Sequence, residues 1–299
     1  MASRILGIGI VTLDIINLVG HYPHEDEELR ADSQHVSRGG NTANTLTVLS
    51  QFQHKCYWMG TIANDSSSTV ILDDLSRNNI DTSLSKKLSI GKQPTSYITL
   101  NTSNGSRTIV HYRDLAELDF THFNNVIKDN TLEQFDWIHF EARAISETVQ
   151  MIKRIKTIYP QIKISVEIEK PRAQLENIFN LADLYLFSKA YANITHFDDA
   201  QDFLTQQKKY SPNADLVCSW GKQGAYALLE NCDFLFSEAY LPNEVSDTIG
   251  AGDTFNAALI HSRLSKQNWQ ESLKFACEIA GKKCGQLGFD NLVTDIDML

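Results

Sequence analysis

The 299-residue sequence lacks the features that mark secreted, zinc-binding or membrane-embedded proteins. Its five cysteines are scattered and form no Cys-x-x-Cys pair, so neither a disulfide framework nor a zinc site is expected. No apolar run is long enough to cross a bilayer. The run Ile5–Leu13 is ended by Asp14, and no small-residue cleavage site follows it. We therefore expect a cytoplasmic protein that does not contact a membrane.

Positive charge is also scarce. Lysine and arginine number 27 against 37 aspartates and glutamates, which gives a net charge of −10. Nucleic-acid binding needs cations that neutralise phosphates, so no nucleic-acid partner is expected. A small anionic substrate is still compatible with this composition, because it needs a few local cations rather than a basic surface.

Several common catalytic motifs are missing. The sequence contains no Gly-x-x-x-x-Gly-Lys-Ser/Thr, no Gly-x-Ser-x-Gly and no His-Glu-x-x-His. The segment Gly7-Ile-Gly-Ile-Val-Thr12 lacks the third glycine of a dinucleotide-binding fingerprint. These absences exclude several large enzyme classes. Because no internal repeat or linker-like segment interrupts the chain, we expect one α/β domain over residues 1–299.

The second half of the chain alternates predicted strands with predicted helices. The strands are Asp136–Phe140, Ile162–Ile168, Leu184–Phe187 and Leu216–Cys218, and the helices between them are Ser146–Ile158, Pro171–Asn180 and Asp198–Lys208. This rhythm predicts a mainly parallel central sheet with helices on both faces. A buried first strand is predicted at Arg4–Leu13.

Two predicted hairpins do not fit this alternation. In the first, Ile15–Val19 and Glu28–Val36 are joined by a polar turn. In the second, two short strands flank Asn104-Gly105, a pair that suits a two-residue type I′ turn. We expect these strands, at about residues 15–36 and 94–112, to form a separate small sheet that acts as a lid or clasp.

The segment Asp247-Thr-Ile-Gly-Ala-Gly-Asp-Thr-Phe255 is the strongest candidate for chemistry. Its small residues precede a helical pattern, and a helix start with exposed N–H groups suits an anion. A carboxylate at Asp253 is badly placed beside a phosphate that is only bound. It makes sense if it accepts a proton from a hydroxyl that attacks the phosphate. The alternative is a glycine-rich loop in which Asp253 is a cap.

Two further places suit a polyhydroxylated ligand. In Arg38-Gly-Gly-Asn-Thr-Ala-Asn44, the two asparagines are three residues apart and share one helix face, where their amides suit neighbouring hydroxyls. The alternative is an asparagine-capped helix with an incidental second asparagine. Asp14 ends the predicted first strand at its carboxyl side, where open α/β sheets bind ligands, although turn residues also occur there.

These segments resemble the two signatures of the ribokinase-like carbohydrate kinases. The matching residues are Asp247-Thr-x-Gly-Ala-Gly-Asp-x-Phe255 and Gly39-Gly-Asn-x-x-Asn44, in the family's order. Further segments, among them Tyr22-Pro-His-Glu-Asp-Glu-Glu-Leu-Arg30 and Ser165-Val-Glu-Ile-Glu-Lys-Pro-Arg172, resemble the branch that converts fructose to fructose 1-phosphate. The resemblance covers nearly the whole chain. It implies a ribokinase-like fold and an ATP-dependent sugar kinase using Mg²⁺, with room for a monovalent cation such as K⁺.

The resemblance also implies roles for single residues. Asp253 would be the catalytic base. The sugar would be held by Asp14, Asp26, Gly40, Asn41, Asn44 and Asp253. The phosphates and the nucleotide would contact Arg107, Gly221, Lys222, Gln223, Gly224, Gly250, Ala251 and Gly252.

One family motif is absent. The N-x-x-E motif linked to magnesium is replaced by Ser188-Lys-Ala-Tyr191, so no metal ligand is assigned from the sequence.

Asp26 enters through an expected homodimer. The first hairpin is too short to stand alone in water, and its apolar residues need a partner surface. In the fructose-phosphorylating branch this hairpin reaches into the neighbouring subunit's site, which selects Asp26 from the acidic turn. The alternative is a monomeric lid. Rivals for the function are another acceptor, such as ribose or adenosine, and a non-catalytic sensor of sugar or nucleotide on the same fold.

Overall fold

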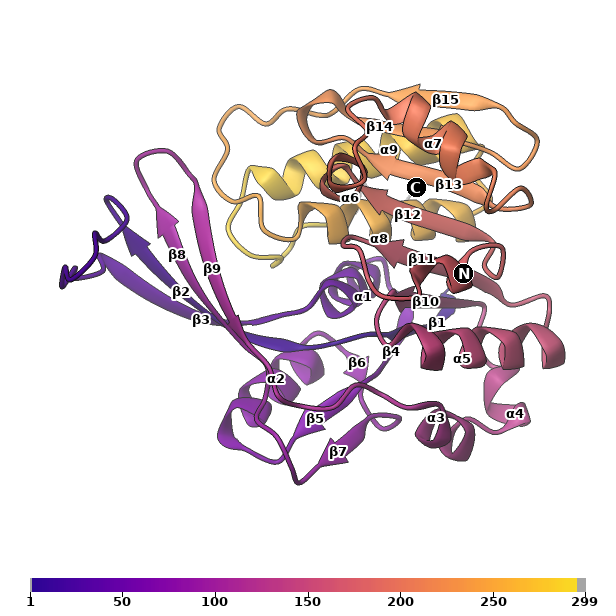
Figure 1. Ribbon diagram of the computed structural model, residues 1–299, viewed down its shortest axis with the longest axis horizontal. Helices are drawn as coiled ribbons and strands as arrows, with labels where there is room; N and C mark the ends of the chain where they lie inside the picture. The colour runs from indigo at the N-terminus through magenta and orange to yellow at the C-terminus, as the bar shows by residue number, and fades with distance from the viewer. Residues whose placement is uncertain (1, 295–299) are drawn as a thin grey trace.

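The computed structural model describes residues 2–294, and its largest element is a nine-stranded sheet with helices on both faces (Figure 1). Seven neighbouring strands of this sheet pair in parallel, and a hairpin adds two antiparallel strands at one edge. In spatial order the strands are β15 (Phe234–Ser237), β14 (Ala225–Leu228), β13 (Asp215–Ser219), β12 (Leu184–Ser188), β11 (Lys163–Ile168), β10 (Trp137–Glu141), β1 (Arg4–Ile8), β4 (Lys55–Met59) and β6 (Ile80–Asp81). The predicted parallel α/β sheet is thereby confirmed.

Two apolar cores lie on the two faces of this sheet. Adjacent strand residues point to opposite faces, so Ile5 packs in one core and Leu6 in the other. The helices on the Ile5 side are α1 (Asn41–Gln51), α2 (Ser66–Arg77), α8 (Ala251–Leu264) and α9 (Trp269–Cys284). The elements on the Leu6 side are α3 (Phe120–Val126), α4 (Asp129–Leu132), α5 (Ile145–Ile158), η1 (Leu175–Ile178), α6 (Lys189–Ile194) and α7 (Ala200–Lys208).

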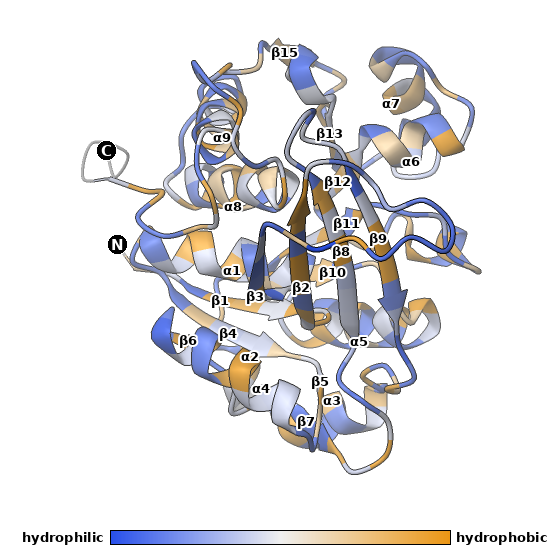
Figure 2. Cartoon of the chain, turned by 90° about the vertical axis from the view of Figure 1, so that its left-hand side faces the viewer, coloured by the Kyte–Doolittle hydropathy of each residue, from blue (hydrophilic) through white to orange (hydrophobic). Residues whose placement is uncertain are grey.

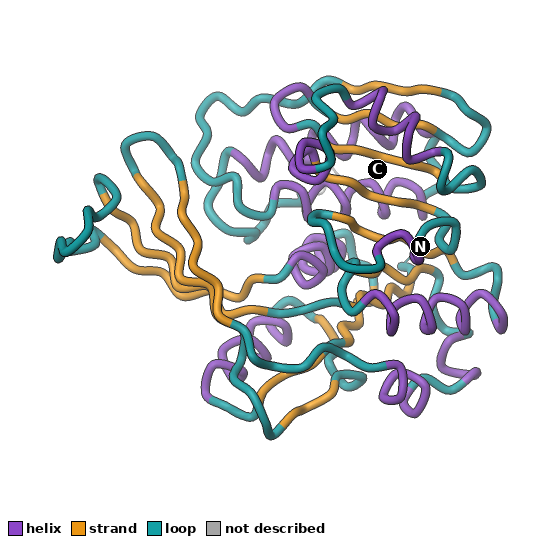
Figure 3. Tube along the Cα trace, in the orientation of Figure 1, coloured by secondary structure: helices purple, strands orange, loops and turns teal. Residues whose placement is uncertain are grey.

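A second sheet of four strands projects from the main body (Figures 1 and 3). Its spatial order is β3 (Ser33–Gly39), β2 (Thr12–Val19), β8 (Thr95–Asn101) and β9 (Arg107–Tyr112). β2 pairs antiparallel with β3 and parallel with β8, so the two predicted hairpins meet side by side. A small parallel pair, β5 (Thr61–Ala63) with β7 (Lys86–Leu88), lies below it in Figure 1.

Several predicted boundaries are wrong. The first strand ends at Ile8 instead of continuing to Leu13, because the chain leaves the large sheet and joins the small one at Thr12. Asp14 therefore lies inside β2, not at the end of β1. The strand expected from Glu28 begins at Ser33, where its pairing with Leu18 starts.

Two further predictions about local conformation are corrected. The helix expected over Pro171–Asn180 is reduced to the short 3₁₀ segment η1, which follows a left-handed Gln174 with a φ of 64°. The Asn104-Gly105 loop is longer than a two-residue turn. Among its two central residues Gly105 alone has positive φ, and the Asn101 N–H donates to the Ser106 carbonyl across the loop. Among the described residues, no helix is long and apolar enough to cross a membrane.

A pair of buried histidines, His54 just before β4 and His261 in α8, joins these two elements. The His54 Nδ1 atom accepts from the Ser3 N–H, so the ring proton is on Nε2 and is donated to His261 Nδ1 over 2.9 Å. Burial lowers the pKa of each ring to about 4. Both nitrogens that would be protonated therefore already accept a hydrogen bond, which a second proton would break.

We predict that this pair makes the fold sensitive to acid. The folded pKa values lie below the unfolded value of 6.5, so the contribution of the pair is complete above pH 6.5 and is lost as the pH falls towards 4. In His261→Asn, which keeps an acceptor near Nδ1, the difference in unfolding free energy from wild type should shrink between pH 7 and pH 5. Urea unfolding at several pH values measures this difference, and a constant difference would contradict the prediction.

Candidate active site

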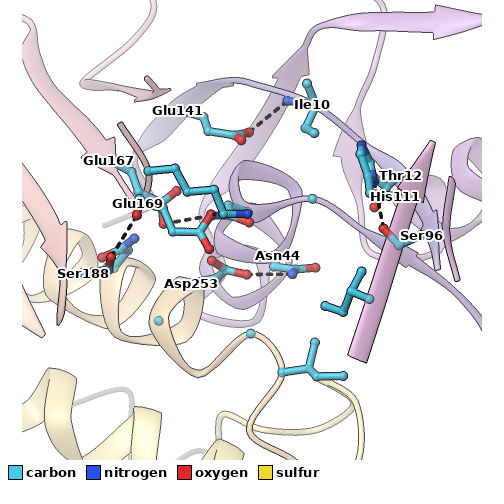
Figure 4. A pocket seen from close by; sticks show the side chains of 18 of the residues that line it. Ile10, Thr12, Asn44, Ser96, His111, Glu141, Glu167, Glu169, Ser188 and Asp253 are labelled. Carbon is cyan, nitrogen blue, oxygen red and sulfur yellow. Dashed lines mark hydrogen bonds and ion pairs between the residues drawn. The ribbon is translucent and has the colours of Figure 1, made fainter. Parts of the chain in front are cut away.

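A cavity of about 530 Å³ opens at the carboxyl ends of the parallel strands (Figure 4). Its walls come from β10, β11 and β12 of the large sheet, from the first turns of α1 and α8, and from the inner face of the small sheet. The crevice beyond the carboxyl ends of parallel strands is the usual ligand position in open α/β sheets. The predicted residues Asp14, Gly40, Asn41, Asn44, Gly250 and Asp253 all line this cavity.

Asp253 is buried in the first turn of α8, with 7% of its surface exposed. The Asn44 Nδ2 atom donates to its Oδ2 over 2.7 Å. The Arg38 guanidinium, itself buried, donates to Asn44 Oδ1 and so fixes which way the amide points. Burial raises the pKa of Asp253 to about 7, against the opposing effect of the Asn44 hydrogen bond. The Asp253 carboxyl therefore gains and loses its proton near neutral pH.

The small sheet brings a second polar group to the cavity. Asp14 accepts a hydrogen bond from Thr12 Oγ1, and burial raises the pKa of its carboxyl. Its neighbours across the sheet are Ser96 and, beyond it, His111, which share a hydrogen bond of 3.2 Å. Asp14 thus points into the cavity from the lid side and not from the large sheet.

Three glutamates that the sequence analysis did not predict join Asp14 and Asp253 in the lining of the first cavity. Glu141 ends β10, while Glu167 and Glu169 stand at the end of β11. Asn41 Nδ2 lies 3.2 Å from an oxygen of both Glu167 and Glu169. Burial, together with the charges of Asp253, Glu141 and Glu169, raises the pKa of Glu167 well above its usual range. The rule applied to Asp14, that ligands bind at strand carboxyl ends, would have found these residues.

Cations line the same cavity and were also missed, apart from Arg107. Arg143 pairs with Glu141 over 3.3 Å and with Glu117, behind the cavity lining, over 2.9 Å, so two carboxylates balance its charge. Arg107 donates to Thr248 Oγ1, which links the small sheet to the loop before α8. The other basic side chains along the wall are Arg113, Lys170 and Arg172.

A second cavity of about 340 Å³ adjoins the first and shares Arg107, Ser219, Thr248 and Gly252 with it. Its wall is largely apolar and comes from the segment after β15 and from α8 and α9, including Tyr240, Leu241, Pro242, Val245, Phe255 and Ala280. The predicted Gly221, Lys222, Gly224 and Ala251 also line it. Gln223 lines neither cavity, and Asp26 lies in an exposed turn away from both.

The loop between the two cavities depends on glycine. Gly250 has a φ of 77°, and a Cβ there would lie 2.2 Å from Phe289 Cζ. Gly252 has no such strain, and no heavy atom lies within 4 Å of the Cβ it would carry. Gly250 is therefore required by the fold itself, whereas the space beside Gly252 faces the cavities.

We predict different outcomes for alanine at these two positions. Gly250→Ala should lower the unfolding free energy by roughly 1–3 kcal/mol, because it adds a left-handed alanine and overpacks Phe289. Gly252→Ala should leave the stability of the free protein within about 0.5 kcal/mol. Urea unfolding of both variants measures this contrast. Equal losses would show that Gly252 also has a structural requirement.

Comparison with known proteins defines the class of this fold and site. The family model described as pfkB family carbohydrate kinase matches residues 2–295, and the chain belongs to this family. It is similar to mouse ketohexokinase, with 41% identity over 299 residues that cover 97% of this chain and 99% of the relative. The protein is therefore a carbohydrate kinase homologous to ketohexokinase.

Solved structures support the fold. Ribokinase from Giardia lamblia superimposes with a TM-score of 0.83 at 17% identity, covering 98% of this chain and 96% of that one. Ribokinase from Arabidopsis thaliana, solved with ribose and ATP, gives a TM-score of 0.79 at 17% identity over 96% and 94% of the two chains. The ribokinase-like fold with a separate small sheet is thereby confirmed.

Proposed function

We propose that this kinase transfers the γ-phosphoryl group of ATP to a ketohexose, converting fructose to fructose 1-phosphate, with Asp253 as the base. The observation that carries the mechanism is the buried Asp253 carboxyl beside the glycine loop, with a pKa raised to about 7. A base with a pKa near the working pH combines the correct protonation state with useful proton affinity. The choice of sugar rests on the 41% identity with ketohexokinase.

Each part of the proposed reaction uses groups already in place. ATP would bind in the apolar second cavity, with its phosphates directed towards Arg107 and the N–H groups at the start of α8. The sugar would lie in the first cavity, where Asp14, Asn41 and Asn44 offer partners for its hydroxyls. Asp253 would accept the proton of the attacking primary hydroxyl. Positioning and charge stabilisation would supply most of the rate.

The donor set also fits Mg²⁺, which kinases use with ATP. The Glu167 Oε2 atom is buried and accepts no hydrogen bond, and Glu169 lies beside it. Among the described residues, no group of three acidic, histidine or cysteine side chains is placed to hold a metal unaided. Mg²⁺ commonly shares one or two carboxylates with substrate phosphates, so Glu167 and Glu169 are the residues that would hold it. When bound, the metal would neutralise charge on the phosphates.

Two alternatives differ from this proposal in testable ways. Another acceptor, such as ribose or adenosine, would use the same base and loop. A non-catalytic sensor would need no carboxyl beside the phosphate, where it repels the ligand. The buried and tuned Asp253 therefore favours catalysis over sensing.

We predict that ADP release, measured in a coupled assay, is fastest with fructose among fructose, ribose and adenosine.

Asp253→Asn should lose about 10²–10⁴-fold in turnover, the usual contribution of a positioned base. Wild-type kcat/KM should rise as the pH rises through about 7, because the base must lose its proton to act. The variant should lack this rise.

Calorimetric binding of the sugar to Asp253→Asn is the control for an intact site. Asp114→Asn, at an exposed carboxylate outside both cavities, is the matched surface variant. Near-wild-type turnover of Asp253→Asn would disprove its role as base. Faster turnover of ribose or adenosine would overturn the sugar but leave the mechanism in place.

The outer face of the small sheet supports a homodimer. Val36, Ile15, Tyr97 and Val110 are direct cross-strand neighbours in one row. Three of them, Val36, Tyr97 and Val110, are 51%, 50% and 66% exposed. The row crosses all four strands of the sheet that Figure 2 presents to the viewer. A contiguous apolar row of this kind typically marks an interface, and a second copy would cover it symmetrically.

We propose that the dimer also completes the site. Asp26 lies in the exposed turn between β2 and β3 and lines neither of the two cavities described above, so any contact with the sugar would be made in the partner subunit. Its φ of 62° sets it apart from the rest of the turn's acidic run. The similarity to ketohexokinase selects it.

We predict that mixing inactive Asp253→Asn with inactive Asp26→Ala subunits restores part of the activity, because some mixed dimers hold one site with both residues intact. Mixing Asp253→Asn with Asn44→Ala is the matched control and should restore nothing, because these two residues belong to one chain's cavity. Analytical ultracentrifugation gives the oligomeric state. No recovery despite verified subunit exchange would disprove the shared site, and a monomer would disprove the dimer.

A further inference from the structure

A fully buried lysine lies beneath the glycine loop. Lys283, in the last turn of α9, has 0% of its side chain exposed. Its ammonium contacts Asp247 Oδ2 at 2.8 Å, the Asp247 carbonyl at 3.2 Å and the Gln286 carbonyl at 3.3 Å. An ammonium has three N–H donors, and three oxygens surround this one. A buried cation of this kind is stable only with such partners, and nothing in the proposed reaction so far uses it.

The partners of Lys283 connect it to the loop. Asp247 begins the glycine-rich segment, and its other carboxylate oxygen accepts from the Ile249 N–H over 2.8 Å. The Lys283 Nζ atom lies 5.3 Å from the centre of the Phe289 ring, the same ring that packs against Gly250. The Lys283 ammonium therefore holds the start of the loop through Asp247. It also lies against the Phe289 ring, which packs beside the left-handed Gly250.

The oxygens around Lys283 are of the type that binds a small cation. One carboxylate and two backbone carbonyls are hard donors, and carbonyl oxygens replace the hydration shell of monovalent ions in proteins. The loop above them presents the N–H groups at the start of α8 to the cavities. Without a cation, the Asp247 carboxylate would be left beside two carbonyl oxygens that also repel it.

We propose that Lys283 is a positioning residue whose buried ammonium is the cation that holds the glycine loop in place. It holds Asp247 and thereby keeps the loop in the position where the N–H groups of Gly250 and Gly252 can meet the transferring phosphoryl group. This inference rests on the proposed role of that loop in phosphoryl transfer. It does not depend on which sugar is the acceptor.

The test compares two variants that differ in the space they leave. Lys283→Ala removes the ammonium and leaves room for an ion, whereas Lys283→Met removes the charge but fills the space. Turnover is measured at constant ionic strength in choline, K⁺ or NH₄⁺ chloride, with the sugar that wild type uses fastest. Lys282→Ala, the neighbouring lysine that pairs with Glu278 on the helix surface, is the matched control.

In choline chloride, the kcat of Lys283→Ala and of Lys283→Met should each be on the order of 10²-fold below that of wild type, because small displacements of catalytic groups have effects of this size. NH₄⁺ or K⁺ should restore turnover of Lys283→Ala relative to wild type and should not restore Lys283→Met. Sugar affinity by calorimetry should stay unchanged in both. Hydrogen exchange should accelerate at residues 247–252, including the Ile249 amide, and not across the rest of the chain.

Wild-type-like turnover in choline would overturn the proposal, as would equal recovery of both variants or no recovery of folded Lys283→Ala. If the single variants do not fold, the pair Asp247→Asn with Lys283→Met removes both charges together, which buried pairs often tolerate. That double variant should fold, turn over slowly and show faster loop exchange. Normal turnover would disprove the role of the cation. A wild type without kinase activity would instead refute the proposed function.

Discussion

Burial of the Asp253 carboxyl in the first turn of α8 is the constraint on which the arrangement of the cavity depends. A buried carboxyl needs a hydrogen-bond donor, and Asn44 provides it from the first turn of α1. Asn44 can donate in that direction because Arg38 occupies its oxygen. Arg38 is held in turn by Asp74 on α2 and by Thr47 on α1. Two helix N-termini therefore meet at one point, through a chain of polar contacts that begins on a third helix.

The same meeting point collects more negative charge than the free protein would favour. Burial raises the pKa of Glu141, as it does for Asp253 and Glu167, and the charges of neighbouring carboxylates add to this effect at Asp253 and Glu167. Asn41 partly relieves the repulsion by lying within hydrogen-bond distance of Glu167 and Glu169 at once. Cations or hydroxyl groups of ligands would relieve the rest. Repulsion among buried carboxylates is typical of binding sites that are complete only when occupied.

The sequence predicted the parts of this site that depend on local pattern. The small residues before Asp253 predict the start of α8, and the alternation of strands and helices is strong enough to predict the sheet. Asp14 was assigned to the wrong sheet because the apolar run from Ile5 to Leu13 continues through the point where the chain leaves β1. Glu141 and Glu167 carry no motif. Their role emerges from the parallel pairing of β10 with β11, which joins distant segments and leaves no local signal.

In the proposed dimer, the small sheet would serve both the sugar and the partner subunit. Its inner row, Asp14, Ser96 and His111, faces the cavity, and the next residue along each strand, or the one before it, points the opposite way. Those neighbours are Ile15, Tyr97 and Val110, the apolar outer row. At the base of the sheet, Ile15 packs against the core on the α2 side, whereas Tyr97 and Val110 are 50% and 66% exposed. A second copy of the chain would bury the outer face while the inner face stays with the sugar.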